Sequence, residues 1–144
     1  MRALRYQTFT DPVDLHVEDV PEPVPAAGEV LVRIHAASVN PVDWKIATGG
    51  FRMLVRGGLP RTMGSDFAGE VISTGAGSTR LAPGDRVFGF VDPFTRTGGT
   101  FAEFAAIPSE FAHRLPDAVP FRDAAALAAL QALPALIRML AASN

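Results

Sequence analysis

The chain has 144 residues, 48% of them hydrophobic, which fits one soluble, folded domain with a sizeable core rather than a disordered chain. Its net charge is −2 at pH 7, from 13 basic and 15 acidic residues, so we expect neither a nucleic-acid partner nor an acidic membrane surface. The chain contains no cysteine, which excludes disulfides and thiolate metal sites, and its N-terminus lacks the apolar core of a signal peptide, so a cytoplasmic protein is expected.

The first third of the chain has the pattern of short strands separated by turns. Apolar and polar residues alternate in residues 1–6 and again in residues 15–20. A proline-rich stretch, residues 21–25, predicts an extended connector. The clearest strand is predicted at residues 29–39, where apolar and polar side chains alternate and Asn-Pro then breaks the pattern.

A short helix is predicted next, at residues 42–48, because a pair of glycines can close it. Residues 51–62 form a basic, glycine-bearing loop that is either a mobile flap over a cleft or an ordinary solvated loop. Turn residues then recur at intervals of about 8–12 residues, which is typical of a β-barrel or β-sandwich. Three further strands are predicted, at residues 67–74, 86–91 and 100–107.

The periodicity becomes helical near the C-terminus. Asp123 is predicted to be an N-cap, followed by a helix at residues 124–142 that Pro134 kinks or breaks. A transmembrane helix is the alternative, although the proline, the polar residues and the dominance of alanine oppose it. The predicted organisation is a β domain at 1–122 and a helical segment at 123–144. An exposed apolar stripe along 124–142 predicts a homo-oligomer or a partner domain bound through this segment.

Four segments, taken together, make a specific pattern: residues 39–45 (VNPVDWK), 64–71 (GSDFAGEV), 83–89 (PGDRVFG) and 98–104 (GGTFAEF). They resemble the N-terminal half of the medium-chain dehydrogenases/reductases, in the zinc-independent quinone oxidoreductase branch. The resemblance implies a mainly β fold with few helices, a GroES-like, partly open β-barrel followed by a C-terminal helix. In the family a Rossmann domain follows and binds NADPH, and hydride passes to a small-molecule quinone or enone.

The resemblance also bears on metal and cofactor. Asn40 and Ser65 stand where zinc-dependent members have cysteine and histidine ligands, so no zinc is expected. No Gly-x-Gly-x-x-Gly occurs in the chain, so the Rossmann domain is expected to be absent and NADPH is not expected to bind this chain alone. We therefore expect the catalytic domain of an NADPH-dependent quinone or enone reductase, inactive without a Rossmann domain. The alternative is a stand-alone binding or assembly module that has lost redox activity.

Five residues form the candidate site. Asn40 is either a turn residue that satisfies local backbone or, by resemblance, an amide beside the cofactor and the reacting carbonyl, and Ser65 is also placed beside the cofactor. Asp43 is either a first-turn residue of the short helix, favourable against the helix dipole, or, by resemblance, a residue that braces the floor of the site. Trp44, the only tryptophan, either fills the core or lines a pocket for a flat aromatic substrate. Lys45, the only lysine, is an electrostatic or proton-donating group, or a solvated surface residue.

Two further features surround this site. Asp66 is expected to accept a hydrogen bond from backbone or to pair with an arginine, rather than to act as a general acid. Gly64, Gly69 and Gly84 are predicted to be packing and turn glycines.

Overall fold

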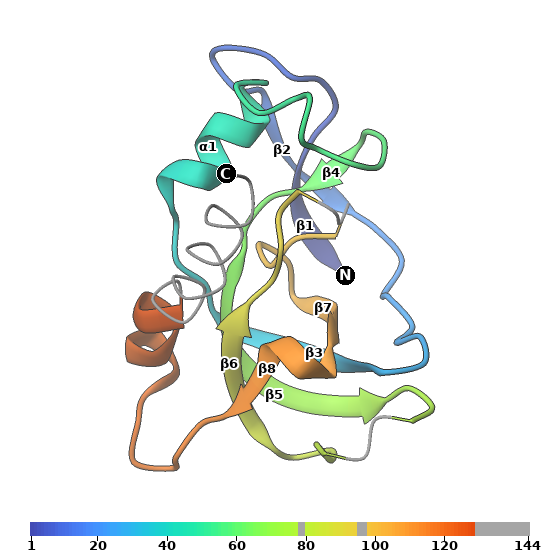
Figure 1. Cartoon of the computed structure of the whole chain (residues 1–144), viewed down its shortest axis with the longest axis vertical. Coiled ribbons are helices and arrows are strands. Elements are labelled where there is room, and N and C mark those ends of the chain that lie inside the picture. The colour runs from blue at the N-terminus through green and yellow to red at the C-terminus, as the bar shows by residue number, and fades with distance from the viewer. Residues whose placement is uncertain (78–79, 95–97, 129–144) are drawn as a thin grey trace, which may run out of the picture.

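The computed structural model describes residues 1–77, 80–94 and 98–128. Within these residues the chain folds into two antiparallel β-sheets, one short α-helix, one turn of 3₁₀-helix and a helical segment at residues 121–128 (Figure 1). No helix in this part of the chain is both long enough and apolar enough to cross a bilayer.

The larger sheet has five strands: β3 (Glu29–Ala36), β5 (Asp66–Thr74), β6 (Arg86–Phe90), β7 (Phe104–Pro108) and β8 (Ala112–Arg114). Their order across the sheet is β7-β3-β5-β6-β8, and every neighbouring pair is antiparallel. One 3₁₀ turn, η1 (Ser109–Phe111), connects β7 to β8. The predicted strands at 67–74 and 86–91 are therefore confirmed with ends within one residue of those expected.

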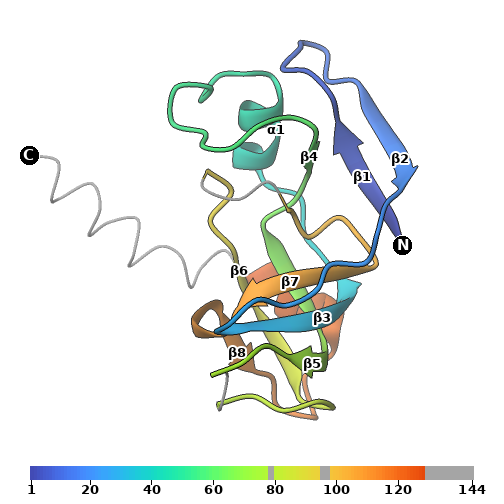
Figure 2. The same cartoon turned by 90° about the vertical axis from the view of Figure 1, so that its right-hand side faces the viewer.

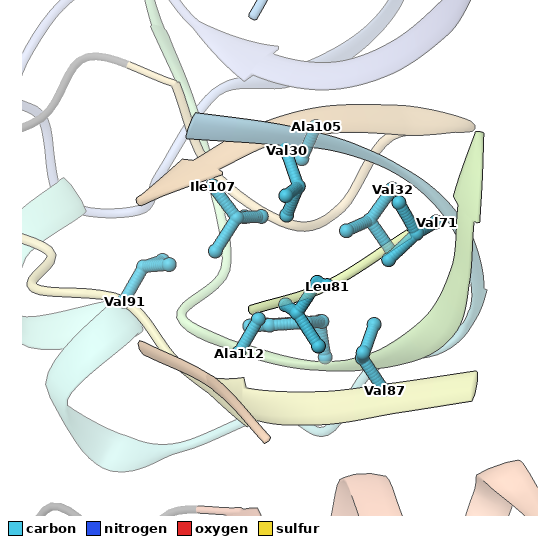
Figure 3. Close-up of a cluster of buried hydrophobic side chains, with 10 residues drawn as sticks. Val30, Val32, Val71, Leu81, Val87, Val91, Ala105, Ile107 and Ala112 are labelled. Atoms are coloured by element: carbon cyan, nitrogen blue, oxygen red, sulfur yellow. The ribbon is translucent and has the colours of Figure 1, made fainter. Parts of the chain in front are cut away.

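This sheet curls around an apolar core (Figure 3). Successive side chains of a strand point to opposite faces, so alternate residues reach the inside of the curl. Val30 and Val32 of β3 and Phe67 and Val71 of β5 are fully buried there. The predicted mainly β, partly open barrel is confirmed, and alternate residues of β3 and β5 supply part of its core.

The smaller sheet lies at the other end of the molecule, together with the short helix α1 (Pro41–Ala47) (Figure 2). Two of its strands match predicted ones, but β4 was not predicted, and neither was β8 in the larger sheet. Strands of two and three residues are too short to show an alternation, so pairing alone defines them. The smaller sheet, in the order β2-β1-β4, consists of β1 (Arg2–Tyr6), β2 (Leu15–Asp19) and β4 (Arg61–Thr62).

The predicted strand 100–107 is a strand only in β7, and its first residues join the two sheets instead. The carbonyl of Phe101 accepts a hydrogen bond from the N–H of Leu4 (2.8 Å), and the N–H of Phe101 donates to the carbonyl of Met63 (2.9 Å). The carbonyl of Glu103 still accepts the N–H of Ile34 in β3 (2.9 Å). Both backbone groups of Phe101, however, bond to Leu4 and Met63, so the β7–β3 ladder does not extend to Phe101.

The helical segment 121–128 packs on the outer face of the larger sheet. Ala124 and Ala125 are buried against Ala68 and Leu115. The remainder of the helix predicted at 124–142 lies outside the described residues, as does the kink predicted at Pro134.

Asp123 is not the N-cap of this helix, contrary to the prediction. The helix starts at Phe121, and the carbonyl of Pro120 accepts the N–H groups of Asp123 and Ala124 (both 3.1 Å), so Asp123 lies in the first turn. Tertiary contacts of Phe121 accompany this earlier start. Its ring stacks on that of His35 at 4.5 Å.

Candidate functional site

The site lies where the chain leaves the larger sheet at the end of β3. β3 ends at Ala36, three residues before the predicted end of the strand, because the chain then turns into α1. Asn40 is the N-cap of α1 in an extended conformation (φ −119°, ψ 153°), and Pro41 follows at the position that its fixed φ suits. The helix buries Asp43 and Ile46, which are three residues apart and hence on one face. The predicted helix at 42–48 is confirmed, shifted by one residue.

Asp43 connects α1 to its N-cap residue, Asn40, and to Ser65, which immediately precedes β5. One carboxylate oxygen, Oδ2, accepts the backbone N–H of Asn40 at 2.8 Å. The other, Oδ1, accepts the hydroxyl of Ser65 at 2.6 Å. Asp43 is only 4% exposed and Ser65 is fully buried, so this carboxylate has a hydrogen-bond donor on each oxygen in a dry environment.

Asp66 holds the side chain of Asn40. Its Oδ2 accepts a hydrogen bond from Asn40 Nδ2 at 2.7 Å and another from Ser38 Oγ at 2.5 Å. Its Oδ1 is buried and has no hydrogen-bond partner within the described part of the chain. The expectation that Asp66 would bind backbone or an arginine is wrong. A serine just beyond a strand carries no local signal, so the sequence could not identify Ser38 as its partner.

Burial raises the pKa of both carboxyl groups. For Asp43, the hydrogen bonds from Ser65 and from the Asn40 backbone oppose that rise, while the nearby Asp66 adds to it. For Asp66, the hydrogen bonds from Ser38 and Asn40 oppose the rise in pKa. Both groups therefore bind a proton more readily than an exposed aspartate does.

Trp44 and Lys45 lie on the outer side of α1, away from this cluster. Trp44 is 45% exposed, so the expectation that it fills the core is wrong, and its ring remains accessible to a ligand. Lys45 is exposed as well. The structure thus brings together Asn40, Asp43 and Ser65, whereas Trp44 and Lys45 lie on the exposed surface of the helix, outside this cluster.

A small cavity adjoins the buried face of the cluster, lined among others by Tyr6, Asp43 and Arg61. Its volume of about 20 Å³ suits a single water molecule and is too small for a quinone. Arg61 is 3% exposed and donates hydrogen bonds to the carbonyls of Arg56 (2.9 Å) and Pro93 (2.7 Å). The loop at 51–62 is therefore anchored at its C-terminal end by a buried arginine, rather than solvated throughout.

The donor set does not fit zinc. Within the residues that the structure describes, no group of three or more His, Cys, Asp and Glu side chains is placed to hold a metal ion. Both oxygens of Asp43 and one of Asp66 already accept hydrogen bonds from protein groups. Asn40 and Ser65 are not residues that zinc favours.

The glycines that follow β5 do not form a dinucleotide cradle. A β-carbon on Gly75 would lie 1.8 Å from the carbonyl oxygen of Ala26, so this glycine allows two backbone segments to approach closely. The described chain after β5 contains no helix that begins at a glycine turn, which is the feature that binds a pyrophosphate. These residues therefore do not fit the phosphates of NADPH.

Comparison with known proteins gives a consistent result. The family model "Alcohol dehydrogenase GroES-like domain" matches residues 26–117, which include all five candidate site residues. The quinone oxidoreductase of Rattus norvegicus is 39% identical over 128 residues, which are 88% of this chain and 37% of that protein. A zinc-type alcohol dehydrogenase-like protein of Schizosaccharomyces pombe, C337.11, is 42% identical over 132 residues, 88% of this chain and 38% of that protein.

A solved structure extends the comparison to a protein with bound cofactor. Escherichia coli quinone oxidoreductase complexed with NADPH superposes with a TM-score of 0.76 at 26% identity, over 88% of this chain and 36% of that one. The chain thus spans a little over a third of the length of each of these relatives.

Proposed function

The chain belongs to the alcohol dehydrogenase GroES-like domain family, and we propose that it is the substrate-side domain of a zinc-independent, NADPH-dependent quinone or enone reductase. The resemblance to quinone oxidoreductases that the four sequence segments suggested is confirmed. Since the chain spans 37% of the rat enzyme, we further propose that activity requires a nucleotide-binding domain in addition to these residues.

The observation that carries the proposal is the fixed orientation of the Asn40 side chain. A carboxamide nitrogen carries two protons, and the bond to Asp66 Oδ2 at 2.7 Å uses one of them. The second N–H remains for a ligand oxygen. Because a buried carboxylate holds the nitrogen, Asn40 does not have to be reoriented when a carbonyl compound binds, and this lowers the free-energy cost of stabilising it.

The neighbouring residues support a flat carbonyl compound. When bound, NADPH supplies the hydride, and negative charge then develops on the carbonyl oxygen of the substrate. The free N–H of Asn40 is suited to donate to that oxygen, and Trp44 offers an exposed aromatic face for a planar ring. Asp43 and Ser65 hold the start of α1 in place from beneath. Lys45, the next residue of α1, adds an exposed positive charge.

The test is reconstitution with a nucleotide-binding domain from a quinone oxidoreductase relative, supplied by fusion or as a second chain. We expect quinone-dependent oxidation of NADPH that neither part supports alone. In the reconstituted enzyme, Asn40→Ala is expected to lower kcat by about 100-fold, the usual cost of removing one donor to a developing oxyanion. The matched control is Ser73→Ala, far along β5, which should leave kcat unchanged.

Two outcomes would contradict this proposal. Folded, assembled protein without NADPH oxidation would favour the stand-alone binding or assembly module. Full activity in Asn40→Ala would show that the amide of Asn40 does not act on the substrate.

A further inference from the structure

The hydroxyl of Ser38 lies between two acceptors that come from distant parts of the chain. Ser38 Oγ is 2.5 Å from Asp66 Oδ2 and 3.1 Å from the backbone carbonyl of Ala125. The same Asp66 oxygen accepts Asn40 Nδ2 at 2.7 Å. One side chain therefore contacts both the carboxylate that orients Asn40 and the helical segment 121–128.

The two acceptors of the Ser38 hydroxyl are buried, which strengthens its hydrogen bonds. Asp66 is completely buried, and Ala125 is 2% exposed. Both acceptors of the Ser38 hydroxyl are thus shielded from water, while Ser38 itself is half-buried, and an ionised carboxylate binds a hydroxyl more strongly than a neutral acceptor does. Because Asp66 Oδ1 has no partner in the described chain, the two donors on Oδ2 determine how this carboxylate is oriented.

The single proton of the Ser38 hydroxyl couples Asp66 to the carbonyl of Ala125. A serine hydroxyl has one proton to donate, and here it faces two acceptors. A change in the position of Ala125 alters the balance between them, and so does a change in the charge of Asp66. Either change affects the donors on Asp66 Oδ2, one of which belongs to Asn40.

We propose that Ser38 is a positioning residue that couples the docking of the helical segment 121–128 to the orientation of the Asn40 amide, through the carboxylate of Asp66. The significance of this coupling for catalysis rests on the proposed function, in which Asn40 meets the substrate. The coupling itself is a property of the chain alone and can be measured without cofactor or substrate.

The experiment is NMR of the whole chain, labelled with ¹³C and ¹⁵N, over a pH titration. In the wild type, the Asn40 Nδ2 resonances and the carbonyl carbon of Ala125 are expected to shift with one common midpoint, that of the Asp66 carboxyl group. In Asp66→Asn that midpoint should disappear from both, and any shift that remains at Asn40 belongs to Asp43, which accepts the Asn40 backbone N–H. In Ser38→Ala the midpoint should persist at Asn40 but move to higher pH, because the carboxylate of Asp66 loses one donor. The same midpoint should no longer be seen at the carbonyl of Ala125.

Conservative and distant variants separate this role from a merely structural one. Ser38→Thr keeps the hydroxyl and should restore the response at Ala125, whereas Ser73→Ala should change neither signal. Amide hydrogen exchange in residues 125–128 should become about fivefold faster in Ser38→Ala, as expected for one ordinary hydrogen bond. The proposal is overturned if the response at Ala125 survives in Ser38→Ala.

The wild type alone decides the matter if Ser38→Ala does not fold. A carbonyl of Ala125 that does not follow the titration of Asp66 would overturn the proposal without any variant. Failure of the reconstituted enzyme to oxidise NADPH would refute the proposed function and leave this coupling intact, so the two failures are distinguishable.

Discussion

Asp43 and Asp66 are two carboxyl groups buried within one cluster of hydroxyl and amide donors. Asp43 has a donor on each oxygen, whereas Asp66 has two donors on one oxygen and none, among the described residues, on the other. Burial without full compensation favours the neutral form, which is why the pKa of each group is raised. At the scale of the residue, the site holds Asn40 in place at a cost in stability.

This cost predicts a pH dependence of folding. The pKa values of Asp43 and Asp66 are higher in the folded than in the unfolded chain, so the folded state binds more protons between the two values. The free energy of unfolding contributed by these groups therefore falls as the pH rises from about 4, the pKa of an unfolded aspartate, and levels off above the raised pKa. Urea unfolding at a series of pH values measures this dependence of the unfolding free energy on pH.

Asp66→Asn should reduce the decrease in unfolding free energy with rising pH, because it removes one of the two titrating groups. Asp19→Asn, a change at an exposed position in β2, serves as the control and should leave the pH dependence as it is. An unchanged pH dependence of the unfolding free energy in Asp66→Asn would show that burial does not raise the pKa of the Asp66 carboxyl group.

At the scale of the element, the close approach of β3 and β5 positions the site. Gly69 of β5 pairs with Ile34, and a β-carbon on it would lie 2.0 Å from the carbonyl oxygen of Arg33. No flexible side chain can yield there, since the obstacle is backbone. The glycine lets β5 run beside β3 so that Asp66 arrives next to Ser38, and its predicted role in packing is explained by this contact.

Gly69→Ala is therefore expected to destabilise the domain by at least about 2 kcal/mol, because the two strands must separate. Chemical denaturation monitored by far-UV circular dichroism provides the measurement. Gly58→Ala is the matched control, since a β-carbon there meets nothing within 4 Å, and its unfolding free energy should stay within about 0.5 kcal/mol of the wild type. Equal stabilities of the two variants would refute the close approach.

At the scale of the whole molecule, the helical segment 121–128 presents two different faces. One face packs on the larger sheet through Ala124 and Ala125, and on the other Leu127 is 54% exposed. Leu127 is the first leucine of the apolar stripe predicted along residues 124–142, most of which lies outside the described residues. An exposed apolar stripe of this length favours association with another apolar surface.

We expect the chain to self-associate through this stripe in the absence of a partner domain. Sedimentation velocity should show a sedimentation coefficient that increases with protein concentration, and Leu127→Glu should reduce the increase. Val24→Glu is a suitable control, because Val24 is exposed and distant in sequence from the stripe. A wild-type chain that sediments as a single monomer at micromolar concentration would contradict this expectation.

The whole chain is also expected not to bind NADPH appreciably by itself, since the described residues contain no helix that begins at a glycine turn, and Gly75 packs against the backbone of Ala26. A thermal-shift titration with NADPH should leave Tm unchanged. A concentration-dependent increase in Tm would show that this chain holds the cofactor without a further domain.

The sequence by itself determined the features that depend on neighbours along the chain. Period-two alternation predicted β3, the turn residues that flank residues 67–74 and 86–91 predicted β5 and β6, and the Asn-Pro break followed by a glycine pair predicted α1. The four ordered segments identified the family and brought Asn40, Asp43 and Ser65 to attention as site residues. In each case the signal is local, because it arises from the geometry of a single strand, helix or turn.

Only the tertiary structure decided which side chains meet. The pairing of Ser38 and Asn40 with Asp66, the burial of Arg61 and the start of the last helix at Phe121 have no local pattern. The contacts of Ser38 and Asn40 with Asp66 depend on the register of β3 against β5. Arg61, in contrast, is placed by its pairing with Tyr6 of β1, and Phe121 by its stacking on His35. These partners lie 26 or more positions apart in the chain. Hydrogen-bond partners at such separations are fixed by the packing of the core, which no short stretch of sequence specifies.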